Sequence, residues 1–123
     1  HKKLQEYVRD LLHIYKKYPC LYQLDNDWNG FQWINANDGD RSIFSFIRKD
    51  ETGKKNLLFV VNFTPVDRPG TETLQAVTLL DNVHGAYKPS QCPTYTSVKS
   101  ECDGQPYSIS YPLGGYGTAI FRF

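Results

Sequence analysis

Seven short segments rich in β-branched and aromatic residues follow one another after Leu21, and turn sequences separate them. These residue types favour extended backbone, whereas clusters of Gly, Pro, Asn and Asp favour chain reversal. The number and spacing of the segments are typical of an antiparallel β-sandwich. The predicted strands are Phe31–Asn35, Ser42–Arg48, Leu57–Asn62, Thr73–Leu79, Tyr95–Lys99, Tyr107–Ser110 and Thr118–Phe123.

The third of these segments is expected at the centre of a sheet. Its run Leu57–Val61 is apolar at every position, so the residues that point to either face are apolar. Such a strand is stable only where both faces are covered. The turns expected between strands are Asn37–Asp40, Thr52–Lys55, Asp67–Gly70, Asp103–Gly104 and Gly114–Gly115.

The segment before the strands has the periodicity of an amphipathic helix. Its two apolar stripes are Leu4, Val8, Leu11, Leu12 and Tyr15, and beside them Tyr7, Ile14 and Tyr18. Together they make a surface wider than a helix with one packing partner needs, so we expect two partners. Pro19 is expected to end the helix near Lys17, because the residue before proline avoids helical backbone. The boundary with the β domain is therefore expected between Pro19 and Gly30.

Composition limits the classes of protein to consider. The chain has 123 residues, 40% hydrophobic and 22% charged, which predicts one soluble globular domain. The net charge of +1 gives no electrostatic argument for nucleic acid or an anionic membrane as partner. No apolar run approaches the roughly 20 residues of a membrane-spanning helix, and the first ten residues do not resemble a signal peptide. Because the chain contains no methionine, we expect it to be a piece of a longer protein.

The cysteines favour a reducing compartment. Cys20, Cys92 and Cys102 are odd in number and lack the spacing of a metal site, which favours free thiols in a cytosolic protein. In that compartment the sequon at Asn62–Thr64 is expected to carry no sugar.

None of three candidate features in the sequence meets the requirements of a chemical site. Asp25–Gly30 begins like a calcium-binding loop, but Ala36 stands where the bidentate Glu belongs, so an Asx-rich turn is favoured. The histidines are scattered, and no nucleophile elbow is present. Gly114–Gly117 precedes a strand and therefore lacks the helix dipole of a phosphate-binding loop. We expect no catalytic residue, no metal and no cofactor in this segment.

The aromatic residues near the first predicted strand leave two interpretations open. Phe31 and Trp33 share one face of the strand, and Gln32 shares the other with Ile34. Aromatic residues at alternate positions are most often core, but a ring at the rim could instead stack on the flat face of a sugar. Trp28 lies in a turn and is expected to be exposed.

Four ordered stretches carry a resemblance to a known family: VRDLLHIYKKYPCLYQLD, GFQWI, SIFSFIRK and LLFVVNFTPVDR. They resemble the C-terminal region of 1,4-α-glucan (glycogen) branching enzymes, which carry V-R-D-L-N-x-L-Y, P-A-L-x-E-L-D, G-F-E-W-I, S-V-x-x-F-x-R and N-F-T-P-V-x-R in this order. The resemblance runs from His1 to about Arg68 and resumes over Ser108–Phe123. Between Pro69 and Gly104 the sequence departs from the family pattern.

The resemblance implies a place in the α-amylase superfamily, whose members have a (β/α)8 barrel followed by an antiparallel β-sandwich. Residues 1–22 would then be the last barrel helix and its exit, and residues 23–123 the C-terminal all-β domain. The family's catalytic carboxylates would lie before residue 1 and act by a retaining mechanism. The implied partners are α-glucan or glycogen, bound through the parent enzyme, and the catalytic barrel itself, in the cytoplasm.

The resemblance also separates one aromatic residue from the others. Trp33 matches the tryptophan of G-F-E-W, which implies a substrate-binding role in contacting glucan, while Gln32 replaces the family's Glu. Phe31, Phe44 and Phe46 remain expected as core, and Arg48, Asn62 and Arg68 as structural residues. Two alternatives stay open: an autonomous carbohydrate-binding module, and the C-terminal domain of a debranching, maltosyl-transferring or other enzyme of the superfamily.

Overall fold

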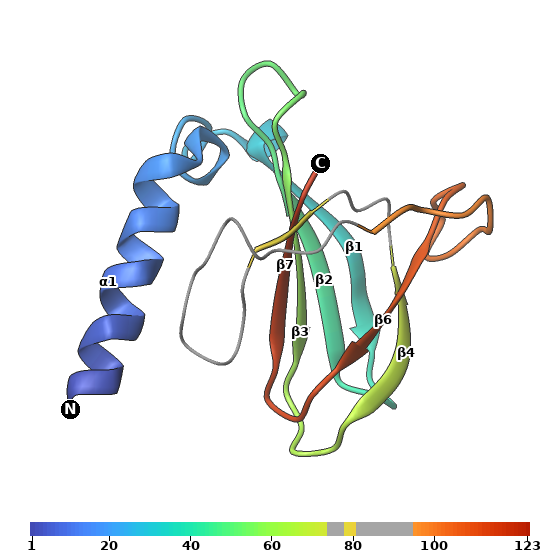
Figure 1. The fold of residues 1–123 in the computed structure, drawn as a ribbon. Helices are drawn as coiled ribbons and strands as arrows, with labels where there is room; N and C mark the ends of the chain where they lie inside the picture. Colours follow the sequence, from blue (N-terminus) through green and yellow to red (C-terminus); the bar gives the residue numbers. More distant parts are fainter. Residues whose placement is uncertain (74–77, 81–94) are drawn as a thin grey trace.

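The computed structural model describes residues 1–73, 78–80 and 95–123, in which one helix precedes two antiparallel sheets (Figure 1). Part of the predicted strand Thr73–Leu79, together with Cys92 and His84, lies outside the described residues. The elements are helix α1 (Lys2–Lys17), the 3-10 helices η1 (Pro19–Leu21) and η2 (Trp28–Gly30), and strands β1 (Phe31–Asp38), β2 (Ile43–Arg48), β3 (Leu57–Asn62), β4 (Arg68–Thr73), β5 (Thr78–Leu80), β6 (Ile109–Leu113) and β7 (Thr118–Arg122).

The larger sheet has five strands in the order β1-β2-β3-β7-β5, and the smaller sheet pairs β4 with β6. Every pairing is antiparallel. Strand β3 lies in the middle of the larger sheet, which confirms the central position predicted from its unbroken apolar run. The fold is therefore mainly antiparallel β with an N-terminal helix, as expected.

The main core lies on the face of the larger sheet that meets strand β6. Alternate residues of β3 and β7 point into it, among them Leu58, Val60 and Phe121, which are at most 2% exposed. Ile109 and Leu113 of β6 join the same buried cluster, so the smaller sheet covers this face. The opposite face of the larger sheet, here called the outer face, carries the remaining alternate residues.

Helix α1 ends at Lys17, as Pro19 predicts. Tyr18 already has extended backbone, and its N–H donates to the carbonyl of Ile14 at 3.0 Å. Ile14 and Tyr18 are buried in a second cluster with Leu57 and Ile120, two residues of the outer face. The C-terminal end of α1 therefore packs on the outer face.

Three predicted segments differ from the structure. The predicted turn Asp67–Gly70 is wrong, because β4 already begins at Arg68. Tyr95–Lys99 does not form a strand and contributes only an isolated bridge between Val98 and Ser108. The predicted strand Tyr107–Ser110 occurs two residues later, as β6.

Over the described part of the chain, no helix combines the length and the apolar character that crossing a membrane requires.

Candidate functional site

The outer face of the larger sheet carries a row of large side chains that crosses four strands. Trp33 of β1 is paired with Phe46 of β2, Phe46 with Phe59 of β3, and Phe59 with Ile120 of β7. Because antiparallel partners on one face lie about 5 Å apart, their side chains form a continuous surface. We call Phe31, Trp33, Phe46 and Phe59 the aromatic row.

The rings of the aromatic row touch in a fixed arrangement. The Phe46 ring stacks on Phe59 at 4.9 Å between centroids and on Phe31 at 5.3 Å, at interplanar angles of 7° and 23°. Trp33 meets Phe31 edge-on at 5.1 Å and Phe46 at 5.8 Å. Each such pair contributes about 0.5–1.5 kcal/mol beyond its buried area. The rings therefore hold one another in place at the surface of the sheet.

The expectation that Phe31, Phe44 and Phe46 belong to the core is wrong. All three are only partly buried and lie on the outer face, away from the cluster that includes Ile43 and Ile47. Alternation shows which residues share a face but not which face is covered. The bulkier aromatic face is the less buried one here.

Trp33 lies at the margin of the aromatic row, with 54% of its surface exposed. Part of its indole is therefore open to solvent, and contacts with the Phe31 and Phe46 rings hold the indole in position. Trp28 is 89% exposed, which confirms the expectation for that residue. Phe59 has no distinguishing signal in the sequence, because Leu57–Val61 is apolar at every position, and only its pairing with Phe46 places it on this face.

The apolar stripes of α1 are exposed over most of the helix. Only Ile14 is buried within α1, near the end that packs on the outer face. The side chains that share this exposed surface, here called the helix stripe, are Leu4, Tyr7, Val8, Leu11, Leu12 and Tyr15. The end of α1 and the aromatic row both lie on the outer face of the larger sheet, and α1 stands beside this sheet (Figure 1).

Arg48 fixes the segment that joins α1 to the sheet. Its guanidinium donates to the carbonyls of Cys20 and Leu21, each at 3.4 Å, and pairs with the Asp25 carboxylate at 2.6 Å. Asp25, the first residue of the calcium-like pattern, is thus one half of an ion pair. The side chain of Arg48 lies beside Phe31 on the outer face. This confirms the structural role expected for Arg48.

Comparison with known proteins decides the family. The family model for "Alpha amylase, C-terminal all-beta domain" matches residues 33–123, which include all seven strands except the start of β1. The chain belongs to this family of alpha-amylase C-terminal all-beta domains. The antiparallel fold and the position of the match agree with the expectation drawn from the ordered motifs.

Three curated relatives of this chain carry the same name. A protein of Butyrivibrio fibrisolvens is 43% identical over 98% of this chain, and one of Bacillus caldolyticus is 31% identical over 99%. One of Nitrobacter hamburgensis is 49% identical over 53% of the chain. Each is named 1,4-alpha-glucan branching enzyme GlgB, which confirms the resemblance. The chain spans about a fifth of the length of the first and second of these relatives, and 9% of the third.

A buried amide stabilises one end of the all-beta domain. Asn62, which is 1% exposed, donates through Nδ2 to the carbonyls of Val66 (2.8 Å) and Gly114 (3.1 Å). Its Oδ1 accepts from the backbone N–H and the hydroxyl of Thr64, at 2.9 and 2.8 Å. Asn62 thus joins the chain after β3 to the turn between β6 and β7, as expected for a structural residue. A sugar on this sequon nitrogen would require these bonds to break.

The segment after β3 and the turn between β6 and β7 approach each other closely. A Cβ on Gly115 would lie 2.2 Å from the carbonyl oxygen of Pro65, so only glycine fits at this position. The N–H of Gly115 donates to the Asp67 carboxylate at 2.9 Å, and that of Tyr116 donates to the carbonyl of Thr64 at 2.7 Å.

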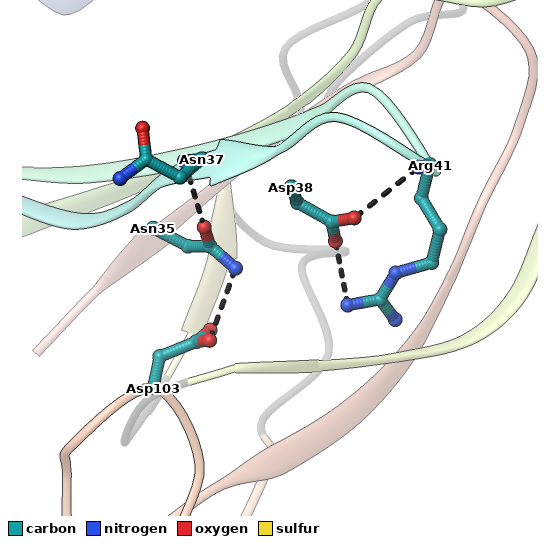
Figure 2. A network of polar contacts seen from close by, with 5 residues as sticks. All are labelled: Asn35, Asn37, Asp38, Arg41 and Asp103. Carbon is teal, nitrogen blue, oxygen red and sulfur yellow. Dashed lines mark hydrogen bonds and ion pairs between the residues drawn. The ribbon is translucent and has the colours of Figure 1, made fainter.

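Polar residues at the turn between β1 and β2 form a second network (Figure 2). Asn35 donates to the Asp103 carboxylate at 3.0 Å and accepts from the backbone N–H of Asn37 at 3.1 Å. Asp38 accepts from the backbone N–H of Arg41 and pairs with its guanidinium at 2.5 Å, which raises the pKa of Arg41. The Asp103 carboxylate joins the hairpin to its own loop, and the Asp38 carboxylate closes the turn on Arg41, so the network is structural.

The described residues contain no group of three His, Cys, Asp or Glu side chains placed to hold a metal ion. The thiol of Cys20 is 1% exposed, and its burial, helped by the negative charge of Asp50, raises its pKa to about 11. A thiol with such a pKa stays protonated at neutral pH and is a poor nucleophile. The outer face, with Trp33 at its margin, is therefore the candidate functional surface of this all-beta domain.

Proposed function

We propose that the chain is the C-terminal domain of a cytoplasmic 1,4-α-glucan branching enzyme. The observation that carries this proposal is the 43% identity to a protein of that name across 98% of the chain. Such an enzyme cleaves an α-1,4-glucan and transfers the piece to a 6-hydroxyl, forming the α-1,6 branches of glycogen. The catalytic carboxylates would belong to the rest of the protein, and this domain would carry none.

The role proposed for this domain is to pack against the catalytic barrel. The helix stripe exposes six large apolar side chains, and the aromatic row adds the half-exposed Trp33 on the outer face, where the end of α1 packs. Burying one such side chain completely stabilises a contact by about 1.5–3 kcal/mol. A barrel seated there would cover both surfaces, and α1 would then have the two packing partners that its wide apolar surface predicts.

Trp33 is the residue proposed to contact glucan. Its indole is half exposed, its orientation is fixed by two neighbouring rings, and it lies at the edge of the proposed seam with the barrel. A flat aromatic ring stacks well on the apolar face of a glucose unit, and the indole N–H can donate to a hydroxyl. Trp33 would hold a glucan chain near the barrel.

The test compares the full-length enzyme, its Trp33→Ala and Trp33→Phe variants, and the chain alone, by iodine staining of amylose. We expect branching by the full-length enzyme and none by the chain alone. Trp33→Ala is expected to raise the KM for amylose several-fold, and Trp33→Phe, which keeps a flat ring, to restore most of the loss. Branching by the chain alone would contradict the proposal, as would a full-length enzyme that leaves amylose unbranched.

The alternative is an autonomous carbohydrate-binding module, which the exposed Trp28 and Trp33 favour. A titration of the chain with glycogen, followed by tryptophan fluorescence, separates the two functions. Saturable binding that Trp33→Ala abolishes would support the module. Absence of binding by the isolated chain, with a Trp33 effect in the full-length enzyme, would support the domain role.

A further inference from the structure

A cavity of about 550 Å³ lies where the end of α1 meets the turn between β2 and β3 and the end of β7. Its apolar walls are Tyr18, Pro19 and Phe123. The other lining residues that the structure describes are cationic: Lys17, Lys54, Lys55 and Arg122. Three separate segments of the chain therefore bring four positive charges to one cavity.

This concentration of charge contrasts with the chain as a whole, whose formal net charge is only +1. Among the residues that the structure describes, no acidic side chain lines the cavity. Within the described part of the chain, neither Lys54, Lys55 nor Arg122 takes part in an ion pair. Like charges so close together repel one another, and an anion would relieve that repulsion.

The two acidic residues nearest in sequence to the lysines are engaged elsewhere. The Asp50 carboxylate accepts from the Thr52 hydroxyl and from the backbone N–H groups of Lys54 and Lys55 at 3.1 and 3.3 Å. Glu51 accepts a hydrogen bond from Gln23 at 3.3 Å. Asp50 therefore fixes the backbone of both lysines. The conformation of the turn then determines where their side chains start.

The end of β7, which forms another wall of the cavity, is also held in place. The backbone groups of Asn56 and Phe123 exchange two hydrogen bonds, of 2.9 and 3.1 Å, which join the turn to the end of β7. Lys17 lies over the Tyr18 ring at 5.5 Å from its centroid. The backbone positions that carry the cations are thus fixed around the cavity before any ligand arrives, which lowers the cost of binding.

We propose that this cavity binds a phosphate monoester of a sugar. The ammonium and guanidinium groups would hold the phosphate, for which both are common ligands in proteins. Pro19 and Phe123 would contact the sugar ring. The volume falls within the roughly 300–1,000 Å³ of small-molecule sites. The ester could be a free sugar phosphate or a phosphate group on a glucan chain. The inference goes beyond the branching role and does not depend on it.

Calorimetric titration of the full-length protein tests the inference with glucose 6-phosphate, inorganic phosphate and glucose as probes. Lys54→Ala with Lys55→Ala is compared with Lys2→Ala and Lys3→Ala, which remove the same charge from exposed positions at the start of α1. We expect saturable binding of glucose 6-phosphate, weaker binding of phosphate and none of glucose. The cavity variant is expected to bind about tenfold more weakly, and the helix variant as the wild type.

Circular dichroism melts of both variants show whether each is folded, since all four lysines are exposed. Absence of saturable glucose 6-phosphate binding would overturn the proposal, as would equal weakening in the two variants or equally tight binding of glucose. A second titration distinguishes the sources of the ester by comparing phosphorylated dextrin with the same dextrin after phosphatase treatment. Tighter binding of the phosphorylated dextrin than of glucose 6-phosphate would assign the ester to the glucan chain.

Discussion

Asp50 is a buried carboxylate that stabilises the turn between β2 and β3. It is 5% exposed, and burial alone would raise its pKa. The Thr52 hydroxyl and the backbone N–H groups of Lys55, Lys54 and Gly53 outweigh that effect and hold the pKa of Asp50 below its usual value. The ionised form is therefore the form that the folded structure stabilises.

The first prediction concerns Asp50→Asn. A pKa that is lower in the folded than in the unfolded chain gives stability that is present above the unfolded value, about 3.9, and is lost as pH falls through the folded value. We expect the variant to lose about 1–3 kcal/mol of unfolding free energy at pH 7. Urea unfolding should show this difference shrink below about pH 4.

The matched control for Asp50→Asn is Asp40→Asn, which makes the same chemical change at an exposed position in another turn. It is expected to alter the unfolding free energy by less than about 0.5 kcal/mol. A stability difference for Asp50→Asn that is the same at both ends of the pH range would contradict the role assigned to the carboxylate.

The second prediction concerns the buried side-chain amide of Asn62. Its amide makes four hydrogen bonds while only 1% exposed, so Asn62→Ala leaves buried donors and acceptors without partners. We expect a loss of about 3 kcal/mol in unfolding free energy, measured by urea unfolding. Asn37→Ala, at an exposed position in Figure 2, should cost less than about 0.5 kcal/mol. Similar losses in the two variants would refute this account of Asn62.

The register of strands β1, β2 and β3 determines how the rings of the aromatic row are arranged. Phe46 touches Phe31, Trp33 and Phe59, whereas Trp33 lies at the margin. We expect Phe46→Ala to reduce the unfolding free energy by about 2–3 kcal/mol and Trp33→Ala by about 1 kcal/mol. Chemical unfolding of the two variants measures the difference, and a larger loss for Trp33→Ala would show that the row is not organised around Phe46.

Sequence patterns predicted those elements whose signals are local. Pro19 set the end of α1, and the unbroken apolar run placed β3 at the centre of its sheet. The patterns missed β4, which contains Pro69, and placed β6 too early, before Pro112. The pair forms a sheet of only two strands with a register shift between Arg68 and Thr71, and edge strands of this kind tolerate proline.

The candidate site was predictable only in part, and for a related reason. The alternation of Phe31 and Trp33 showed that the two side chains share a face. Which face is covered depends on residues distant in sequence, since Ile109 and Leu113 of β6 cover the opposite side. The cationic cavity had no local signal at all, because Lys17, Lys54 and Arg122 come together only in the folded chain.

Apolar surface is distributed unevenly over the described structure. The sandwich buries Leu57, Leu58 and Phe121 completely, yet α1 leaves Leu4 64% and Leu12 54% exposed. Large exposed apolar patches mark sites of contact with another protein surface. In the proposed branching enzyme, the catalytic barrel would supply that surface by packing on the helix stripe and the aromatic row.

The measurement that tests this claim most directly is the thermal unfolding midpoint of Leu4→Gln with Leu12→Gln, in the isolated chain and in the full-length enzyme. Lys3→Gln with His13→Gln, at neighbouring exposed positions of α1, is the control in both. If the barrel covers the helix stripe, the leucine variant should match the control in the isolated chain. In the full-length enzyme it should lose about 2–4 kcal/mol of stability, with a midpoint several degrees lower. Equal midpoints for the leucine variant and its control in the full-length enzyme would contradict the claim.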